Sequence, residues 1–326
     1  MPELDPLLAL AGLLVGFTVG LTGMGGGALM TPVLVLLFGV QPLTAVSSDL
    51  VVSLFMKPIG GAVHMRRGTV NRPLVTWLVL GSVPSAFLGV LLLRALGDGE
   101  TVQEVVKVAL GAALLVATSA MVVRTYLNLR QRARERDAAA AGLPIPGLGP
   151  MRVRPVPTLL VGAAGGFVVG MTSVGSGSLI IVLLLLLYPM LSSSEVVGTD
   201  LVQAVPLVAA AALGHLLFGS VELDLTASLL LGALPGVYAG ARVSAHAPQG
   251  FLRRALAVVL VASGLRLVGL SGEATLLAVV VGGALAAAAW SAIRRAHGYP
   301  WLVRTEKRQA DTRLFFESMA ADSSKR

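Results

Sequence analysis

Two glycine-rich stretches interrupt apolar runs of this 326-residue chain and are the first places where its residues could do chemistry. Residues 22–27 read Thr-Gly-Met-Gly-Gly-Gly, and residues 172–177, 150 positions later, read Thr-Ser-Val-Gly-Ser-Gly. Glycine costs roughly 1 kcal/mol against alanine inside a helix, so both stretches predict unwound turns. An unwound turn before a helix exposes backbone N–H groups at the positive end of the helix dipole, where anions bind. The predicted substrate-binding residues there are Thr22, Gly23, Met24, Gly25, Gly26, Gly27, Thr172, Ser173, Gly175, Ser176 and Gly177.

Two other interpretations of these glycines must be weighed. They could simply allow helices to pack closely, as small residues do in membranes. The consecutive glycines argue against this, because a packing motif would space them by four residues. A nucleotide-binding loop is disfavoured because no lysine follows the glycines.

Two polar side chains inside apolar runs are further substrate-binding candidates. Lys57 lies between Met56 and Pro58, and a cation buried in a membrane span is a functional-site hypothesis by default. The alternative is that its stem snorkels toward the membrane interface. Gln203 could line the transport path or bond a neighbouring helix.

Matched acidic and histidine residues are candidates for coupling or gating. Asp49 and Asp200 could relay protons, but the sequences before them favour helix capping. His64 and His215 stand where a predicted span meets a loop, which favours an interfacial hydrogen bond over a proton relay. With four histidines and no cysteine in the chain, we expect no metal site, cofactor or disulfide.

The composition is that of a polytopic membrane protein. Hydrophobic residues make up 55% and charged residues 13% of the chain, and the mean hydropathy is +0.83. Several apolar runs approach the ~20 residues that cross a bilayer as a helix, so an all-α membrane fold is predicted. The net charge of +8 does not indicate nucleic acid, because the arginines cluster beside apolar runs. The expected partners are a small anion, the lipid bilayer, a coupling proton and further copies of the chain.

The two halves of the chain resemble each other. Residues 16–22 match 166–172, Asp49 matches Asp200, and the two histidines match each other, whereas Val208 stands where the first half has Lys57. The sequence therefore predicts two repeats, each a broken, re-entrant helical hairpin followed by three spans. In the first repeat a polar link over 41–48 precedes spans expected at about 48–64, 73–93 and 102–126, and in the second repeat the spans are expected near 196–217, 225–242 and 251–270. The predicted layout is a first transmembrane repeat over 1–126, a cytoplasmic Arg- and Pro/Gly-rich linker over 127–156, a second repeat over 157–270, an extra transmembrane helix over 271–293 and a cytoplasmic basic tail over 294–326.

Loop charges set the expected orientation. If each hairpin enters and leaves on one side, the basic loop at 66–72, the linker and the basic tail share the cytoplasmic side, and the acidic turns lie outside. If each broken segment crosses once, the basic loop at 242–254 falls outside. The first arrangement is favoured, and it inverts one repeat relative to the other. We expect a multi-pass protein of the cell (inner) membrane, with its N-terminus outside and its C-terminus in the cytoplasm.

The pattern in Gly16–Gly27, followed by Pro32, Ser48-Asp49 and Arg66-Arg67, resembles the sulfite exporter TauE/SafE family of membrane permeases. The resemblance covers both repeats, roughly residues 8–270. It implies secondary transport of small anions, with export of sulfite or an organosulfonate by alternating access around the glycine turns, and no enzyme activity. The alternatives are an anion channel or an uptake permease for another sulfur oxyanion or a carboxylate. Ser173 and Ser176 depart from the family's glycines, so the site is expected to be asymmetric.

Overall fold

The computed structural model describes residues 4–22, 26–97, 99–141, 152–189, 191–243 and 249–296. Gly23, Met24 and Gly25 of the first glycine-rich stretch lie outside these ranges, as do residues 142–151 of the predicted linker and nearly all of the predicted tail. The regular elements of the described ranges are all α-helices. They are α1 (Pro6–Thr22), α2 (Gly27–Leu37), α3 (Pro42–Arg66), α4 (Arg72–Ala95), α5 (Glu100–Ala140), α6 (Pro155–Thr172), α7 (Leu179–Leu187), α8 (Ser193–Phe218), α9 (Leu223–Val243), α10 (Gln249–Leu267) and α11 (Gly272–Ala296).

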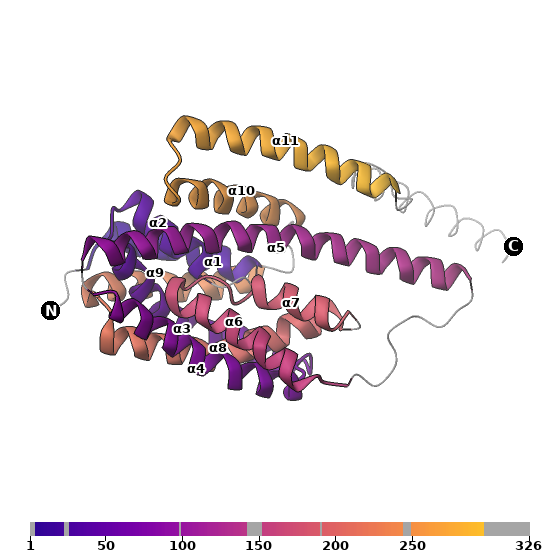
Figure 1. Ribbon diagram of the computed structural model, residues 1–326, viewed down its shortest axis with the longest axis horizontal. Coiled ribbons are helices and arrows are strands. Elements are labelled where there is room, and N and C mark those ends of the chain that lie inside the picture. Colours follow the sequence, from indigo (N-terminus) through magenta and orange to yellow (C-terminus); the bar gives the residue numbers. More distant parts are fainter. Residues whose placement is uncertain are drawn as a thin grey trace, which may run out of the picture.

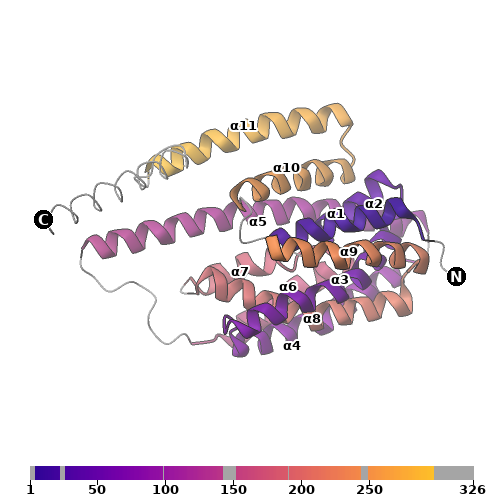
Figure 2. The same ribbon diagram turned by 180° about the vertical axis from the view of Figure 1, so that it is seen from behind.

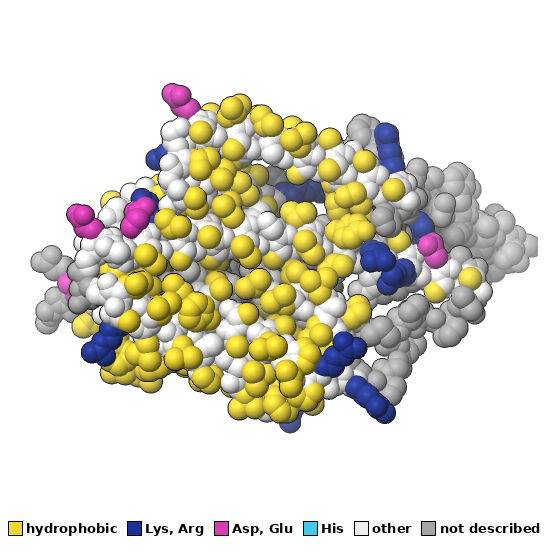
Figure 3. Space-filling model, in the orientation of Figure 1, with side chains coloured by type: hydrophobic (Ala, Val, Ile, Leu, Met, Phe, Trp, Pro, Cys, Tyr) yellow, Lys and Arg dark blue, Asp and Glu magenta, His cyan; other side chains and the backbone are white. Residues whose placement is uncertain are grey.

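The prediction of a polytopic helical membrane protein is confirmed. Seven described helices are long and apolar enough to cross a bilayer: α3, α4, α5, α6, α8, α9 and α11. The helices run side by side along the long axis of the molecule (Figures 1 and 2). Figure 3 shows hydrophobic side chains over the middle of the visible face, with charged side chains gathered toward its two ends. An apolar belt between charged ends is what a lipid bilayer requires.

Local signals explain several helix starts. The side chain of Asn71 accepts a hydrogen bond from the Leu74 backbone N–H at the start of α4. Ser192 and Glu195 form a reciprocal capping box at the start of α8. Both devices satisfy N–H groups that the first turn of a helix leaves without partners.

Three helices differ from the sequence prediction. α3 begins at Pro42, not near residue 48, because proline is well suited to the first helical position. α5 continues to Ala140, well beyond the expected end near residue 126, so the arginine-rich start of the predicted linker is helical. Its Arg, Gln, Glu and Ala residues are good helix formers. α10, predicted as a span, is not among the seven candidates and carries three arginines.

Glycines at four-residue spacing join the helices of the two halves. α1 packs along α9, and α4 packs along α6. A Cβ on Gly12 would lie 2.5 Å from the carbonyl oxygen of Leu229, and one on Gly89 would lie 2.8 Å from that of Phe167. Only glycine permits backbones to approach this closely. Gly16, Gly20, Gly81, Gly162, Gly166, Gly170, Gly232, Gly236 and Gly240 make similar approaches.

The core consists of two hydrophobic clusters with α3 in both. One gathers side chains from α1, α2, α3, α5, α9 and α10. The other gathers side chains from α3, α4, α5, α6, α7 and α8. Since α3 also packs against α8, its polar residues lie deep within the protein, between the two clusters.

Candidate functional site

The second glycine-rich stretch is an unwound turn between α6 and α7, as predicted. α6 ends at Thr172 and α7 begins at Leu179. Gly175 and Gly177 have φ values of 132° and 101°, and Ser173 has a φ of 60°. Ser173 is the only non-glycine residue with a positive φ in the described part of the chain. Such a conformation costs a serine about 1 kcal/mol or more and tends to occur at functional sites.

The first glycine-rich stretch meets the second. Gly26 and Gly27 are the two of its glycines that the structure describes, and α2 begins at Gly27. A Cβ on Gly27 would overlap the carbonyl oxygen of Ser173 and lie 2.7 Å from its hydroxyl oxygen. A Cβ on Gly26 would lie 3.6 Å from a carboxylate oxygen of Asp49. The two breaks are therefore in direct contact, far apart as they are in the sequence.

Lys57 reaches from α3 to the second turn. Its Nζ donates to the Ser176 Oγ at 2.6 Å, and the residue is only 7% exposed. The snorkelling alternative is therefore wrong. An ammonium group has three donors, and this hydrogen bond uses one of them. No other described side chain or backbone group accepts from Lys57, so two N–H donors of a buried cation are left over.

Asp49 lies inside α3 and binds both hairpins. One of its carboxylate oxygens accepts from the Thr31 hydroxyl of α2 at 3.0 Å. The hydroxyl of Ser173 in the second turn also donates to it. The carboxylate is fully buried and lies about two turns from the start of α3. The interpretation of Asp49 as a helix cap is therefore wrong, because α3 begins earlier than expected.

Asp200 has an equivalent position in α8. It accepts from the Gln203 Nε2 at 3.0 Å and from the backbone N–H of Gly177. It is 1% exposed and lies well inside α8, which Ser192 caps instead. The capping interpretation is wrong here too. Lys57 acts electrostatically on Asp49 and Asp200 alike, so two carboxylates and one ammonium surround the second turn.

Gln203 extends this polar group toward α4. Its Oε1 accepts from the Ser82 hydroxyl at 3.3 Å while its Nε2 holds Asp200. It is fully buried. It does bond a neighbouring helix, and in doing so it also fixes the orientation of the Asp200 carboxylate.

The two threonines of the glycine-rich stretches bond to their own helices. The Thr22 hydroxyl donates to the Thr18 carbonyl at 2.8 Å. The Thr172 hydroxyl oxygen lies 2.7 Å from the Val168 carbonyl and accepts from the Val174 N–H at 3.2 Å. They shape the turns, and the hydroxyls of the serines are better placed for a ligand.

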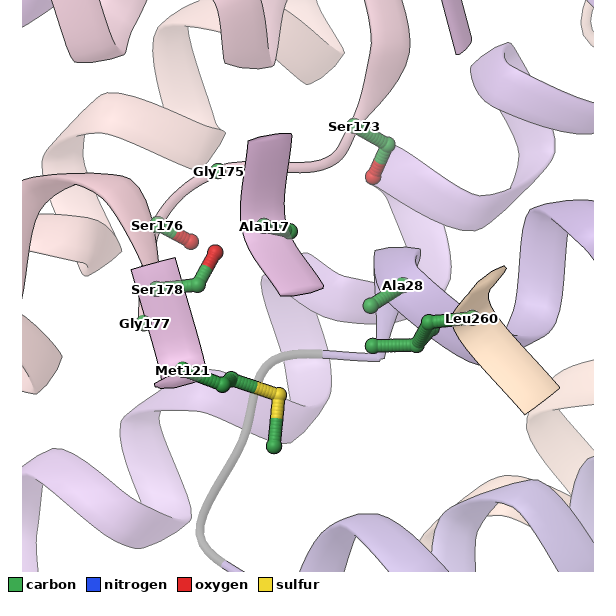
Figure 4. Close-up of a pocket in the computed structure, with 9 residues that line it drawn as sticks. All are labelled: Ala28, Ala117, Met121, Ser173, Gly175, Ser176, Gly177, Ser178 and Leu260. Atoms are coloured by element: carbon green, nitrogen blue, oxygen red, sulfur yellow. The ribbon is translucent and has the colours of Figure 1, made fainter. Parts of the chain in front are cut away.

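A small cavity opens beside the second turn (Figure 4). In the figure the hydroxyls of Ser176 and Ser178 point toward each other on one side of it. Helices α2, α5 and α10 complete the wall. The lining residues are Ala28, Ala117, Met121, Ser173, Gly175, Ser176, Gly177, Ser178 and Leu260.

Arg124 is a residue near the site that the sequence interpretation did not single out. It acts electrostatically on Asp200 from α5. It stands close to the expected end of the α5 span, where an arginine is ordinary at a membrane interface. The charge pattern alone therefore gave no reason to place it near a buried carboxylate.

The two histidines have different surroundings. His64 lies at the end of α3, and its Nδ1 is 2.9 Å from the Thr69 hydroxyl, as expected for a hydrogen bond at the interface. His215 is fully buried. Its Nε2 donates to the Gly170 carbonyl at 2.8 Å, and its Nδ1 lies 2.7 Å from the Ser47 hydroxyl. The interfacial prediction is wrong for His215, which joins α8, α6 and α3 inside the protein.

Among the described residues, no three His, Asp or Glu side chains gather closely enough to hold a metal ion. The polar cluster around the second turn contains one ammonium, two carboxylates, several hydroxyls and the N-terminus of α7. This combination can bind a small anion and exchange protons next to it.

Comparison with known proteins gives a consistent result. A family model described as "Sulfite exporter TauE/SafE" matches residues 8–267. The chain is 38% identical over 262 residues to the probable membrane transporter protein YjnA of Bacillus subtilis (strain 168), covering 80% of this chain and 98% of the relative. It is 23% identical over 263 residues to the probable membrane transporter protein YdhB of the same organism, covering 80% and 99%. No solved structure shows a significant match.

Proposed function

Because the chain belongs to the sulfite exporter TauE/SafE family, a family of membrane transporters and not of enzymes, we propose that it is a secondary transporter of small anions. The proposed substrate is sulfite or an organosulfonate, and the proposed direction is export. The anion binds beside the second turn, where Lys57, Ser176 and the N-terminus of α7 meet. An uptake permease for another sulfur oxyanion or a carboxylate is the nearest alternative.

The observation that carries this proposal is the incomplete set of hydrogen bonds of Lys57. A buried cation is stable only if its donors are satisfied or a counter-charge is present. Lys57 makes one hydrogen bond, to Ser176. Asp49 and Asp200 already provide counter-charges, and an oxyanion with several acceptor oxygens supplies the missing hydrogen-bond acceptors.

Coupling to a proton follows from the charges around Lys57. With Asp49 and Asp200 both ionised, the two carboxylates offset the charges of Lys57 and of Arg124, which acts on Asp200, and each ionised carboxylate repels an anion that approaches Lys57. A proton on either carboxylate removes this repulsion. We therefore assign Asp49 and Asp200 to coupling. His64 is further from these residues along α3 and is assigned to gating, together with His215.

The arrangement of the helices supports inverted repeats and alternating access. α1 packs on α9 and α4 on α6, while α3 pairs with α8 and α5 with α10. Exchanging the two halves of the chain leaves these pairings unchanged. α2 and α7 lie toward opposite ends of the long axis (Figures 1 and 2). Two hairpins that enter from opposite faces and touch at their tips can open the site to one side at a time.

The charge distribution supports an external N-terminus. In Figure 3 acidic side chains lie at the end where Figure 1 places the N-terminus, and most basic side chains lie at the opposite end. Basic residues favour the cytoplasmic side. The long α5 extends to that basic end (Figure 1).

Counterflow in proteoliposomes tests the proposal. Vesicles containing the purified protein are loaded with unlabelled sulfite and diluted into trace radiolabelled sulfite. A carrier shows saturable uptake that internal sulfite accelerates, whereas a channel shows no such acceleration. The same assay with methanesulfonate, thiosulfate and acetate ranks the substrates. The proposal is abandoned if none of these anions gives saturable counterflow.

A further inference from the structure

A second small cavity lies at the C-terminal ends of α4 and α8. Its wall includes Val90, Leu93 and Arg94 of α4, and His215 and Phe218 of α8. The function proposed above assigns no ligand to this cavity. Because it lies at the ends of two spans, it is near one membrane surface of the protein, on the side proposed to be external.

Arg94 is held at this cavity by an aromatic ring. Its guanidinium carbon lies 4.3 Å from the centre of the Phe218 ring, and Phe87 packs edge-on against Phe218 at 6.0 Å. Stacking occupies a face of the guanidinium and leaves the N–H donors at its edge available. No carboxylate of the described residues forms an ion pair with Arg94. Arg94 is thus an exposed cation that rests on an aromatic ring and has no ion-pair partner among the described residues.

The opposite wall of the cavity connects to the central site. His215 lies on this wall, and its Nε2 donates to the carbonyl of Gly170, in the last turn of α6 before the second glycine-rich turn. Its other nitrogen contacts Ser47, two residues before Asp49. A ligand in the cavity therefore lies next to the two helices that carry the proposed anion site.

Arg94 also stands out against its electrostatic surroundings. The neighbouring chain segments at this end are acidic, with Glu100, Glu222 and Asp224 at the starts of α5 and α9. Acidic side chains repel an anion from this end. The exposed guanidinium at the edge of the cavity offsets this repulsion at one point.

From these features we propose that the cavity is a second anion-binding site, at which Arg94 holds the oxyanion on its way between the central site and the outside. The planar guanidinium fork matches two oxygens of a sulfite or sulfonate group. Val90 and Leu93 supply an apolar wall beside it. This inference rests on the proposed transport of anions and on the proposed orientation.

The test uses the absence of cysteine from the natural chain. Ser220→Cys places one thiol next to the cavity residue Gly219. The full-length variant, purified in detergent, is treated with a negatively charged methanethiosulfonate reagent (2-sulfonatoethyl) and separately with a positively charged one (trimethylammonioethyl). The ratio of the two rates reports the local charge. Ala274→Cys, at the exposed start of α11, is the matched control.

We expect the anionic reagent to be favoured in the Ser220→Cys variant relative to the control. Adding Arg94→Gln should lower the ratio by about tenfold, because a nearby unit charge acts on the two reagents in opposite directions. Adding Arg94→Lys should keep most of the ratio. Methanesulfonate, which does not react with these reagents, should slow the labelling only when Arg94 is present.

Two outcomes overturn the inference. One is a ratio that Arg94→Gln leaves unchanged. The other is protection by phosphatidylglycerol in mixed micelles but not by methanesulfonate, which would make Arg94 a contact for a lipid headgroup. A Lys57→Gln variant, measured in parallel, separates this test from that of the central site. If Lys57 does not bind anions, counterflow is unaffected in that variant, while the ratio at position 220 still reports on Arg94.

Discussion

Replacing Lys57 with glutamine should weaken anion binding strongly. Glutamine removes the positive charge, and even if its amide bonds Ser176 it offers one further N–H donor instead of two. A hydrogen bond to a charged group contributes about 1.5–3 kcal/mol, and losing one partner of a buried charge pair costs about 2–5 kcal/mol. Taking about 3 kcal/mol for the loss, the Kd should rise roughly 100-fold.

Isothermal titration of the purified protein with methanesulfonate measures this change. The control is Lys107→Gln, which makes the same substitution at an exposed lysine paired with Glu104 at 3.3 Å. A surface pair of this kind is worth less than about 1 kcal/mol, so its Kd should stay within threefold of the natural protein. A Lys57→Gln protein that elutes as a folded species and binds with unchanged Kd would refute the reasoning.

Three further predictions follow from the packing and the topology. Gly16→Val should destabilise the protein by about 3 kcal/mol or lower the yield of folded protein, because the valine side chain would overlap the Ala233 backbone. Gly282 has open space around it, so Gly282→Val should change the melting temperature little. Equal effects of the two substitutions would contradict the close packing of α1 on α9. His215→Ala should lower the free energy of unfolding by about 2 kcal/mol, because two buried hydrogen bonds are lost. His64→Ala loses one half-exposed hydrogen bond and should lower it by less than about 1 kcal/mol. Thermal unfolding in detergent compares the two variants, and the reverse order would contradict the role of His215 in joining α8, α6 and α3. Arg67→Cys should resist a membrane-impermeant maleimide in intact cells and react after permeabilisation, whereas reaction in intact cells would reverse the proposed orientation.

The sequence was most informative where a glycine-rich or charged segment interrupts an apolar run. Apolar runs interrupted by glycines predicted the breaks, and the second is seen between Thr172 and Leu179. Lys57 was identified because a charge inside an apolar run requires a reason. Its partner Ser176, 119 residues away, could be suspected only because both residues were candidates for the same anion.

The errors came from helix boundaries and from packing. A polar segment, 41–48, suggested a loop, yet it is the first part of α3, because the hydroxyls of Ser47 and Thr44 are buried against other helices. Because α3 therefore begins at Pro42, Asp49 lies inside the helix and does not cap it. The glycines spaced by four, such as Gly12 and Gly236, were visible in the sequence, but which helices they join depends on tertiary contacts. The bridge of His215 to Gly170 depends on such contacts too.

Locating the bound anion tests the central claim most directly. Crystals of the protein grown with iodomethanesulfonate would show the iodine by anomalous scattering, and the sulfonate density beside it. The account predicts a sulfonate oxygen within hydrogen-bonding distance of the Lys57 Nζ, next to Ser176 and the start of α7. An occupied sulfonate elsewhere, with Lys57 still bonded to Ser176 alone, would contradict it.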